Sequence, residues 1–121
     1  MTLLDNKTIK SAMLRPVDDL LEESGYPAIV LDLNSLSLLD EDALQQVERW
    51  SRQQPCPVIG FGPEHSAAVV CVDAAVENHG ELGTMLRRIA SNPQASTVLV
   101  QVLRAIEHLS PAEGLIFHRK V

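Results

Sequence analysis

Two short apolar runs stand out in the first half of the chain. Residues 28–33 read AIVLDL and residues 57–61 read PVIGF, and both are rich in residues that favour strands. Continuous apolar runs of this length are typical of strands covered on both faces, as in a parallel sheet. The segment between them is long enough for a right-handed crossover through a helix. A third run, AAVVCVDAAV at 67–76, predicts another strand over residues 68–72.

The segments around these runs show the spacing of amphipathic helices. Residues 15–25 read RPVDDLLEESG, with a proline in the first turn and a glycine that suits a left-handed helix stop. The stretch before this helix gives only a weak signal. Residues 38–54 predict the clearest helix, because four apolar side chains fall on one face: Leu39, Ala43, Val47 and Trp50.

The last third of the chain is predicted to be helical. Asn78 and Glu81 have capping-box spacing at the start of one helix, and Asn92 followed by Pro93 begins the next. This second helix is apolar around most of its circumference, so it needs partners on two sides. A further short helix is expected from Ser110, with an apolar end at residues 115–117.

These elements predict an α/β fold with a small, mostly parallel sheet flanked by helices and a helical C-terminal third. Its strands are expected near residues 28–33, 57–61 and 68–72. A length of 121 residues fits one domain, expected to span residues 1–121. Aromatic residues make up only 3% of the chain, so the core must be built from aliphatic side chains.

The charge distribution narrows the range of partners. The formal net charge is −6, and residues 1–50 hold ten acidic side chains against four basic ones. An acidic first half repels a phosphate backbone, so we expect no nucleic-acid partner. The N-terminal residues lack the pattern of a signal peptide, and no apolar window reaches the length of a membrane span. A cytoplasmic protein with no membrane partner is therefore expected.

The reactive residue types form no recognisable catalytic or metal-binding pattern. Cys56 and Cys71 lie in or beside apolar runs with no CxxC spacing, which predicts two buried, reduced thiols. The four histidines lack the spacing of metal ligands on a helix. No metal site, no resident cofactor and no catalytic residue is therefore predicted.

One position in the predicted fold favours a ligand. Parallel sheets bind ligands beyond the carboxyl ends of their strands. The candidates for binding are the residues that end or follow the first two predicted strands: Asn34, Ser35, Gly60, Gly62, Glu64 and His65. An ordinary polar turn is the competing interpretation of the same residues.

A longer pattern resembles a known family. The stretch VERWSRQQPCPVIGFG, followed by AAVVCVDAAVEN, is similar to the crotonase superfamily of enoyl-CoA hydratases and isomerases. NPQASTVLVQVLRAIEHLSPAEGL is also similar to a segment that precedes the hydratase-like part of some longer members. The resemblance covers residues 26–118. It implies a coenzyme A thioester as the substrate class, with the thioester carbonyl held by two backbone N–H groups between glycines.

The sequence departs from the family where the chemistry takes place. The loop after the first strand reads NSLSLLDED and has no glycine, and the loop after the second reads FGPEHSAA without consecutive glycines. Glu64 and Glu77 match no catalytic glutamate motif of the family. The resemblance therefore predicts a degenerate domain, inactive alone, that serves assembly or supports a partner's acyl-CoA site. It also fits the N-terminal part of a longer hydratase/isomerase-like protein.

Two alternatives stay open at this stage. The first is an acyl-CoA enzyme with an altered oxyanion site. The second is a STAS-like partner-binding module, because AIVLDLNSLSLLDEDAL is similar to the strand-to-helix segment of that regulatory domain. The STAS fold has a strand hairpin before the position of residue 28, whereas the residues there look mainly helical.

The C-terminal helices are the predicted route of assembly. Crotonase relatives pack their subunits through C-terminal helices, so the resemblance implies a homo-oligomer or a partner subunit. The apolar end at residues 115–117 favours the same interpretation independently.

Overall fold

The computed structural model describes residues 3–106 of the chain. The elements in order are α1 (Ile9–Ala12), α2 (Val17–Ser24), β1 (Ile29–Asp32), α3 (Leu33–Leu36), α4 (Glu41–Arg52), β2 (Val58–Phe61), the 3-10 helix η1 (Ala67–Cys71), β3 (Ala74–Val76), α5 (His79–Ser91) and α6 (Pro93–Ile106). The helix expected from Ser110, and the apolar end at 115–117, lie outside the described residues.

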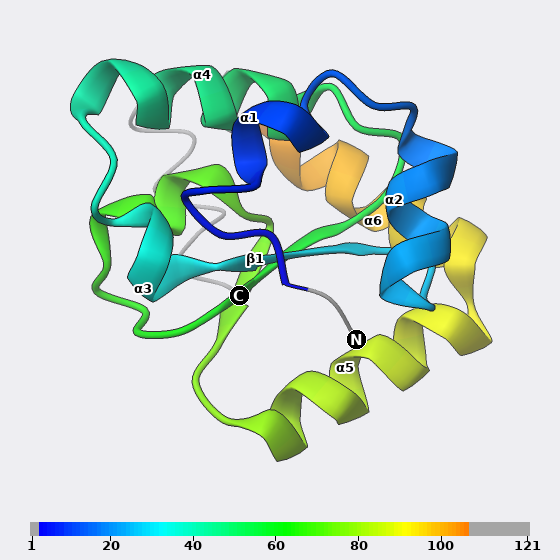
Figure 1. The fold of residues 1–121 in the computed structure, drawn as a ribbon. Coiled ribbons are helices and arrows are strands. Elements are labelled where there is room, and N and C mark those ends of the chain that lie inside the picture. Colours follow the sequence, from blue (N-terminus) through cyan, green and yellow to red (C-terminus); the bar gives the residue numbers. More distant parts are fainter. Residues whose placement is uncertain (1–2, 107–121) are drawn as a thin grey trace.

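A three-stranded parallel sheet forms the centre of the domain (Figure 1). The strand order is β1-β2-β3, with Ile29 paired to Val58 and Ile59 paired to Ala74. The fold class predicted from the sequence, α/β with a small parallel sheet and a helical C-terminal part, is confirmed. The bounds of β1 and β2 agree with the predicted strands to within one residue.

The two outer edges of the sheet differ. Leu4 lies beside β1 as an isolated parallel bridge: its N–H donates to Val30 at 2.9 Å, and its carbonyl accepts from Asp32 at 2.9 Å. Within residues 3–106, no strand lies beyond β3. Half of the backbone polar groups of an edge strand face outward, so β3 is the open edge of the sheet.

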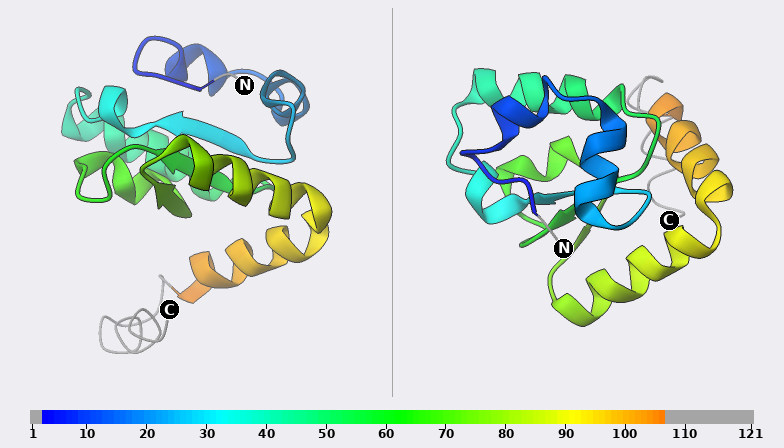
Figure 2. Two further views of the ribbon diagram at one scale, coloured as in Figure 1. Left: turned by 90° about the horizontal axis from the view of Figure 1, so that it is seen from below. Right: turned by 45° about the vertical axis from the view of Figure 1, so that its right-hand side comes forward.

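Helices cover both faces of the sheet (Figures 1 and 2). One face, with Leu31 and Val58, packs against α1, α2, α3, α4 and η1 in the larger core cluster. The other face, with Val30 and Ile59, packs against the buried side of α5. This alternation follows from the two-residue period of a strand and explains why both apolar runs are continuous. Each fully buried Leu or Ile side chain contributes roughly 1.5–3 kcal/mol.

The predicted start of α5 is confirmed by its capping contact, whereas the helix predicted over residues 38–54 spans only Glu41–Arg52 and begins after Asp40. The Asn78 side chain accepts the backbone N–H of Glu81 at 2.8 Å, and the Asp40 side chain accepts that of Ala43 at 2.8 Å. Gly25 ends α2 with a φ of 76°, the left-handed conformation that glycine adopts without strain. The helix predicted before residue 26 is α2, and within residues 3–28 no strand hairpin precedes β1.

The third predicted strand was placed wrongly. Residues 67–71 form η1, with Ala68 and Cys71 buried, and the strand β3 begins only at Ala74. The Ser66 hydroxyl accepts the Ala68 N–H at 3.2 Å and starts the 3-10 turn. The Asp73 N–H donates to the Val58 carbonyl at 2.7 Å, which sets the start of the pairing with β2. An apolar run cannot show these contacts, because a buried helical turn and a buried strand have the same composition.

Candidate functional site

The structure brings the predicted ligand-binding residues to one edge of the sheet. Asn34 and Ser35 lie in α3 directly after β1, Gly60 lies in β2, and the other three follow β2 in the loop to η1: Gly62, Glu64 and His65. The expectation that the carboxyl ends of neighbouring strands meet is therefore correct. What these residues contact determines whether the edge is open to a ligand.

The hydroxyl of Ser35 forms hydrogen bonds with the N-terminal segment. Its hydroxyl donates to the Asn6 Oδ1 at 2.7 Å and accepts the Asn6 backbone N–H at 2.7 Å. The Asp32 carboxylate accepts the Ser35 N–H at 3.4 Å and so caps the short helix α3. Ser35 therefore tethers residue 6 to α3, and the exposed Asn34 beside it lies in the same short helix.

Gly60 and Gly62 make room for Leu33. A Cβ atom on Gly60 would come within 2.8 Å of the Leu33 side chain, and one on Gly62 within 2.9 Å of the Leu33 Cβ. Gly62 also has a φ of +146°, which a side chain rarely adopts. The two glycines thus permit a close approach inside the fold, with Leu33 fully buried against them.

The loop after β2 uses the amides of Gly62, Glu64 and Ser66 for internal hydrogen bonds. The N–H of Gly62 donates to the Val76 carbonyl at 2.9 Å, and the N–H of Ser66 donates to the Pro63 carbonyl at 3.1 Å. The N–H of Glu64 donates to the Glu77 carboxylate at 3.2 Å, which joins this loop to the end of β3. Glu64, His65 and Glu77 have exposed side chains.

A buried ion pair is the polar centre that the sequence did not reveal. The Arg104 guanidinium donates to both carboxylate oxygens of Asp73, from Nε at 2.8 Å and from Nη2 at 2.7 Å. Both side chains are only 9% exposed. The remaining N–H groups donate to the carbonyls of Gln54 at 2.7 Å, Cys56 at 3.0 Å and, more distantly, Arg52 at 3.5 Å. Asp73 in turn accepts the Val58 N–H at 2.8 Å.

This ion pair fixes α6 against the amino ends of β2 and β3. Val58 begins β2, and Asp73 lies one residue before β3, so one arginine joins both strands to the last described helix. The only signal in the sequence is a single arginine in the apolar run TVLVQVLRAI and a single aspartate in VVCVDAAV. A buried carboxylate needs a partner, but the sequence does not identify which of ten basic residues it is.

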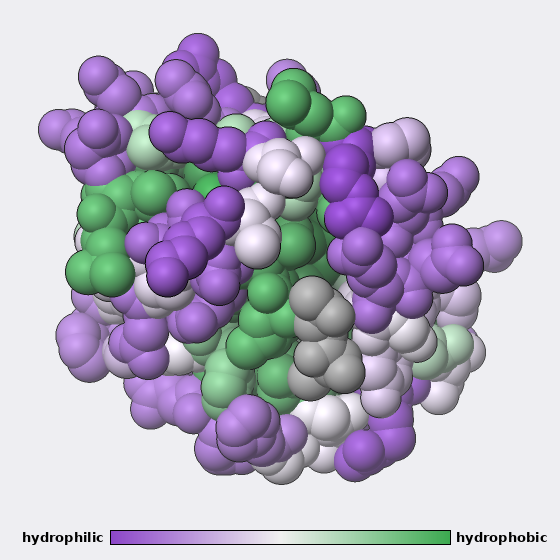
Figure 3. Space-filling model, in the orientation of Figure 1, coloured by the Kyte–Doolittle hydropathy of each residue, from purple (hydrophilic) through white to green (hydrophobic). Residues whose placement is uncertain are grey.

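Helix α6 presents apolar side chains to the outside. Its inner side buries Val100 and Arg104, whereas Val98, Leu99 and Val102 are 57%, 58% and 50% exposed. These three residues recur at helical spacing and form what we term the outer face of α6. The helix was expected to need partners on two sides; one side packs on the domain, and a partner for the other side stays a prediction. The molecular face that carries α1 to α4 is mostly hydrophilic, with apolar patches near its centre and at its upper and left edges (Figure 3).

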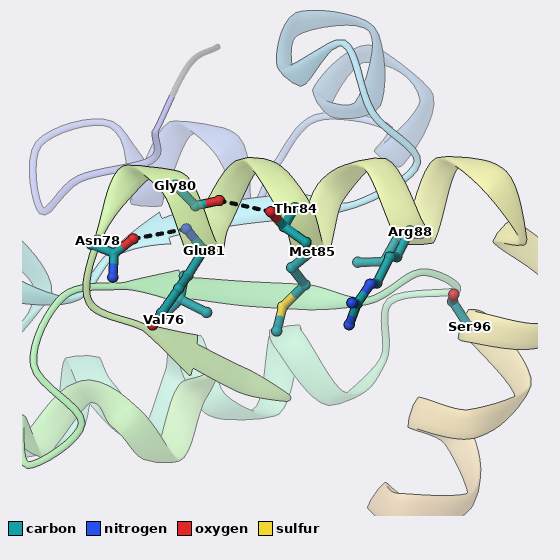
Figure 4. A pocket seen from close by; sticks show the side chains of 9 residues that line it. Val76, Asn78, Gly80, Glu81, Thr84, Met85, Arg88 and Ser96 are labelled. Atoms are coloured by element: carbon teal, nitrogen blue, oxygen red, sulfur yellow. Dashed lines mark hydrogen bonds between the residues drawn. The ribbon is translucent and has the colours of Figure 1, made fainter.

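A groove runs along α5, beside its contact with β3. It has a volume of about 740 Å³ and runs between α5, β3 and the first turn of α6. Met85 points into it from α5, between Glu81 and Arg88, and Val76 of β3 lies opposite (Figure 4). The groove is adjacent to the open edge of the sheet, and the carbonyl of its lining residue Val76 accepts the Gly62 N–H of the loop after β2.

The thiols are buried and separate. Burial raises the pKa of both Cys56 and Cys71 to about 11, so neither is a thiolate at neutral pH. The predicted pair of buried free cysteines is confirmed. Among residues 3–106, no group of three or more His, Cys, Asp or Glu side chains is arranged to hold a metal ion. The helices of this part are also too short or too polar to cross a bilayer.

Comparisons with known proteins leave the chain without an assigned relative. No family model, no curated protein and no solved structure matches it.

Proposed function

We propose that this chain is a non-catalytic domain of the enoyl-CoA hydratase/isomerase type that serves assembly, with the outer face of α6 as its docking surface. In this role the domain holds a partner subunit in place and supports the acyl-CoA site of that partner. The observation that carries the proposal is the exposure of Val98, Leu99 and Val102 on a helix that is itself firmly anchored.

The anchoring of α6 matters for binding. Arg104 ties the helix to the sheet through Asp73 and through three main-chain carbonyls. A helix that is already ordered loses little conformational freedom when it binds, so more of the interaction energy appears as affinity. Burying the exposed half of a Val or Leu side chain gains roughly 1 kcal/mol. The three side chains together therefore supply about 3 kcal/mol at the centre of an interface.

The loop after β2 supports the non-catalytic half of the proposal. An oxyanion site needs two backbone N–H groups that point at one carbonyl oxygen. In this loop the amides of Gly62, Glu64 and Ser66 already donate to groups of the protein itself. Gly60 and Gly62 leave room for the Leu33 side chain, which fills the space beside them.

Light scattering on purified protein tests the assembly role. The wild type is expected to form an assembly of more than one chain, and Leu99→Glu with Val102→Glu is expected to lower its mass. Leu38→Glu is the matched control, because Leu38 is 77% exposed but lies outside α6. A wild type that stays monomeric and binds no hydratase-type subunit contradicts the proposal, as does equal loss of mass in the control.

Titration calorimetry separates the proposal from the enzyme alternative. Acetyl-CoA and crotonyl-CoA are added in turn to the isolated chain, and no binding heat is expected with either. Saturable binding of crotonyl-CoA would instead favour an enzyme with an altered oxyanion site.

A further inference from the structure

The groove side of α5 carries opposite charges at its two ends. Glu81 lies in the first turn and Arg88 in the last part of the helix, and both side chains are exposed. Met85 lies between them, partly buried, and points into the groove (Figure 4). These residues are spaced i, i+4 and i+7, which places them on one stripe of the helix about 10 Å long.

A stripe of this kind is complementary to itself. When two copies of such a helix meet antiparallel about a two-fold axis, each end of one stripe faces the opposite end of the other. With the axis near Met85, Glu81 of each copy faces Arg88 of the other. The same operation brings the two Met85 side chains together at the centre of the contact.

We propose that a second copy of this chain occupies the groove, with the two α5 helices antiparallel and Glu81 paired with Arg88 across the interface. The proposal goes beyond the assembly role of α6, because it concerns a different surface and specifies the partner. It rests on the charge pattern of the stripe and on the groove, which follows the open edge of the sheet beside β3. The two-fold contact thus covers both Met85 and the side of the sheet that the described residues leave unpaired.

The helix dipole alone also favours an acid near the start of a helix and a base near its end. It does not account for the partly exposed Met85 between the two charges, nor for the groove at this position. The two explanations give different results when the charges are exchanged. Exchange of both residues places each charge at the wrong end of the dipole, but it restores opposite charges across a two-fold interface.

Sedimentation equilibrium of four variants tests the contact. In the Leu99→Glu/Val102→Glu background, which removes association through α6, the chain is expected to be a dimer through α5. In that background, Glu81→Arg and Arg88→Glu are each expected to weaken the dimer by more than about tenfold in Kd. The variant with both charge substitutions is expected to regain affinity to within about threefold of the parent chain. Arg87→Glu is the control, because it makes the same charge change one position outside the stripe.

The outcome is separable from that of the α6 experiment. Dimers should persist when Leu99 and Val102 are replaced by Glu, because α5 is untouched. A melting curve by circular dichroism confirms that each variant is folded, which the exposure of both side chains makes the expected result. A monomeric wild type would overturn the proposal, as would single variants that dimerise normally. So would a double variant whose loss of dimerisation free energy equals the sum of the losses in the two single variants.

Discussion

Replacement of Arg104 by methionine removes the contact that holds α6 on the sheet. Methionine keeps much of the aliphatic volume but leaves the Asp73 carboxylate buried, with the Val58 N–H as its remaining hydrogen-bond donor. The carbonyls of Gln54 and Cys56 lose their donor as well. Breaking one side of a buried ion pair typically costs about 3–5 kcal/mol, because an uncompensated charge stays behind. This is a large share of the 5–15 kcal/mol that stabilises an ordinary domain.

Urea unfolding followed by circular dichroism measures this loss. Arg15→Met is the matched control, because the Arg15–Glu23 pair has the same 2.7 Å separation but side chains that are 36% and 43% exposed. Exposed pairs of this kind contribute little to stability, because water screens both charges. The combined variant Asp73→Leu/Arg104→Met should be less destabilised than Arg104→Met alone, since no charge is then left buried.

Hydrogen exchange identifies where the stability is lost. In Arg104→Met the amides of α6 should exchange faster relative to those of β1, because the helix loses its main polar anchor. A free energy of unfolding within about 0.5 kcal/mol of the wild type, the range of ordinary surface substitutions, would refute this reasoning. Equal destabilisation by Arg15→Met would refute it as well.

Three further predictions concern single sites. Gly62→Ala should destabilise the fold by about 1–3 kcal/mol in urea, because of the φ of +146° and the contact with Leu33, whereas Gly25→Ala, in open space, isolates the cost of positive φ alone. Asn78→Ala should cost about 1 kcal/mol by thermal unfolding, because the Glu81 N–H loses its cap, and an unchanged melting temperature would contradict this. Burial raises the pKa of Cys56 and Cys71 from 9.0 to about 11, so their contribution to stability is complete below pH 9 and is lost as the pH rises through 11. A Cys56→Ala/Cys71→Ala variant should show a shallower fall in unfolding free energy over that range, and an identical slope would contradict the account.

Local sequence patterns were sufficient for the strands and helices with strong signals. The runs at 28–33 and 57–61 are short, apolar and β-branched, and both form buried parallel strands. Asn78 fixes the predicted start of α5 through a contact three residues away, whereas the same kind of contact at Asp40 starts α4 three residues later than the predicted helix. Such contacts are local, so the sequence contains them directly.

Tertiary contacts determine the features that the sequence did not predict. Residues 67–71 became a 3-10 helix and moved the strand to Ala74, because Asp73 pairs with Val58 across fifteen residues. The Arg104–Asp73 pair joins residues thirty-one apart, and no local pattern relates them. Topology alone placed the candidate ligand residues at one edge of the sheet. Ser35 bonds to Asn6, and Gly60 and Gly62 pack against Leu33; these contacts form only in the folded chain, so no local pattern predicts them.

The central claim is that this domain contributes a docking surface rather than a reaction centre of its own. Hydrogen exchange with mass spectrometry, recorded at low and high protein concentration with and without crotonyl-CoA, tests it most directly. The account predicts that protection of α6 increases with protein concentration and that the loop at residues 62–66 is unaffected by crotonyl-CoA. Protection of that loop by crotonyl-CoA, with α6 unchanged at every concentration, would contradict it.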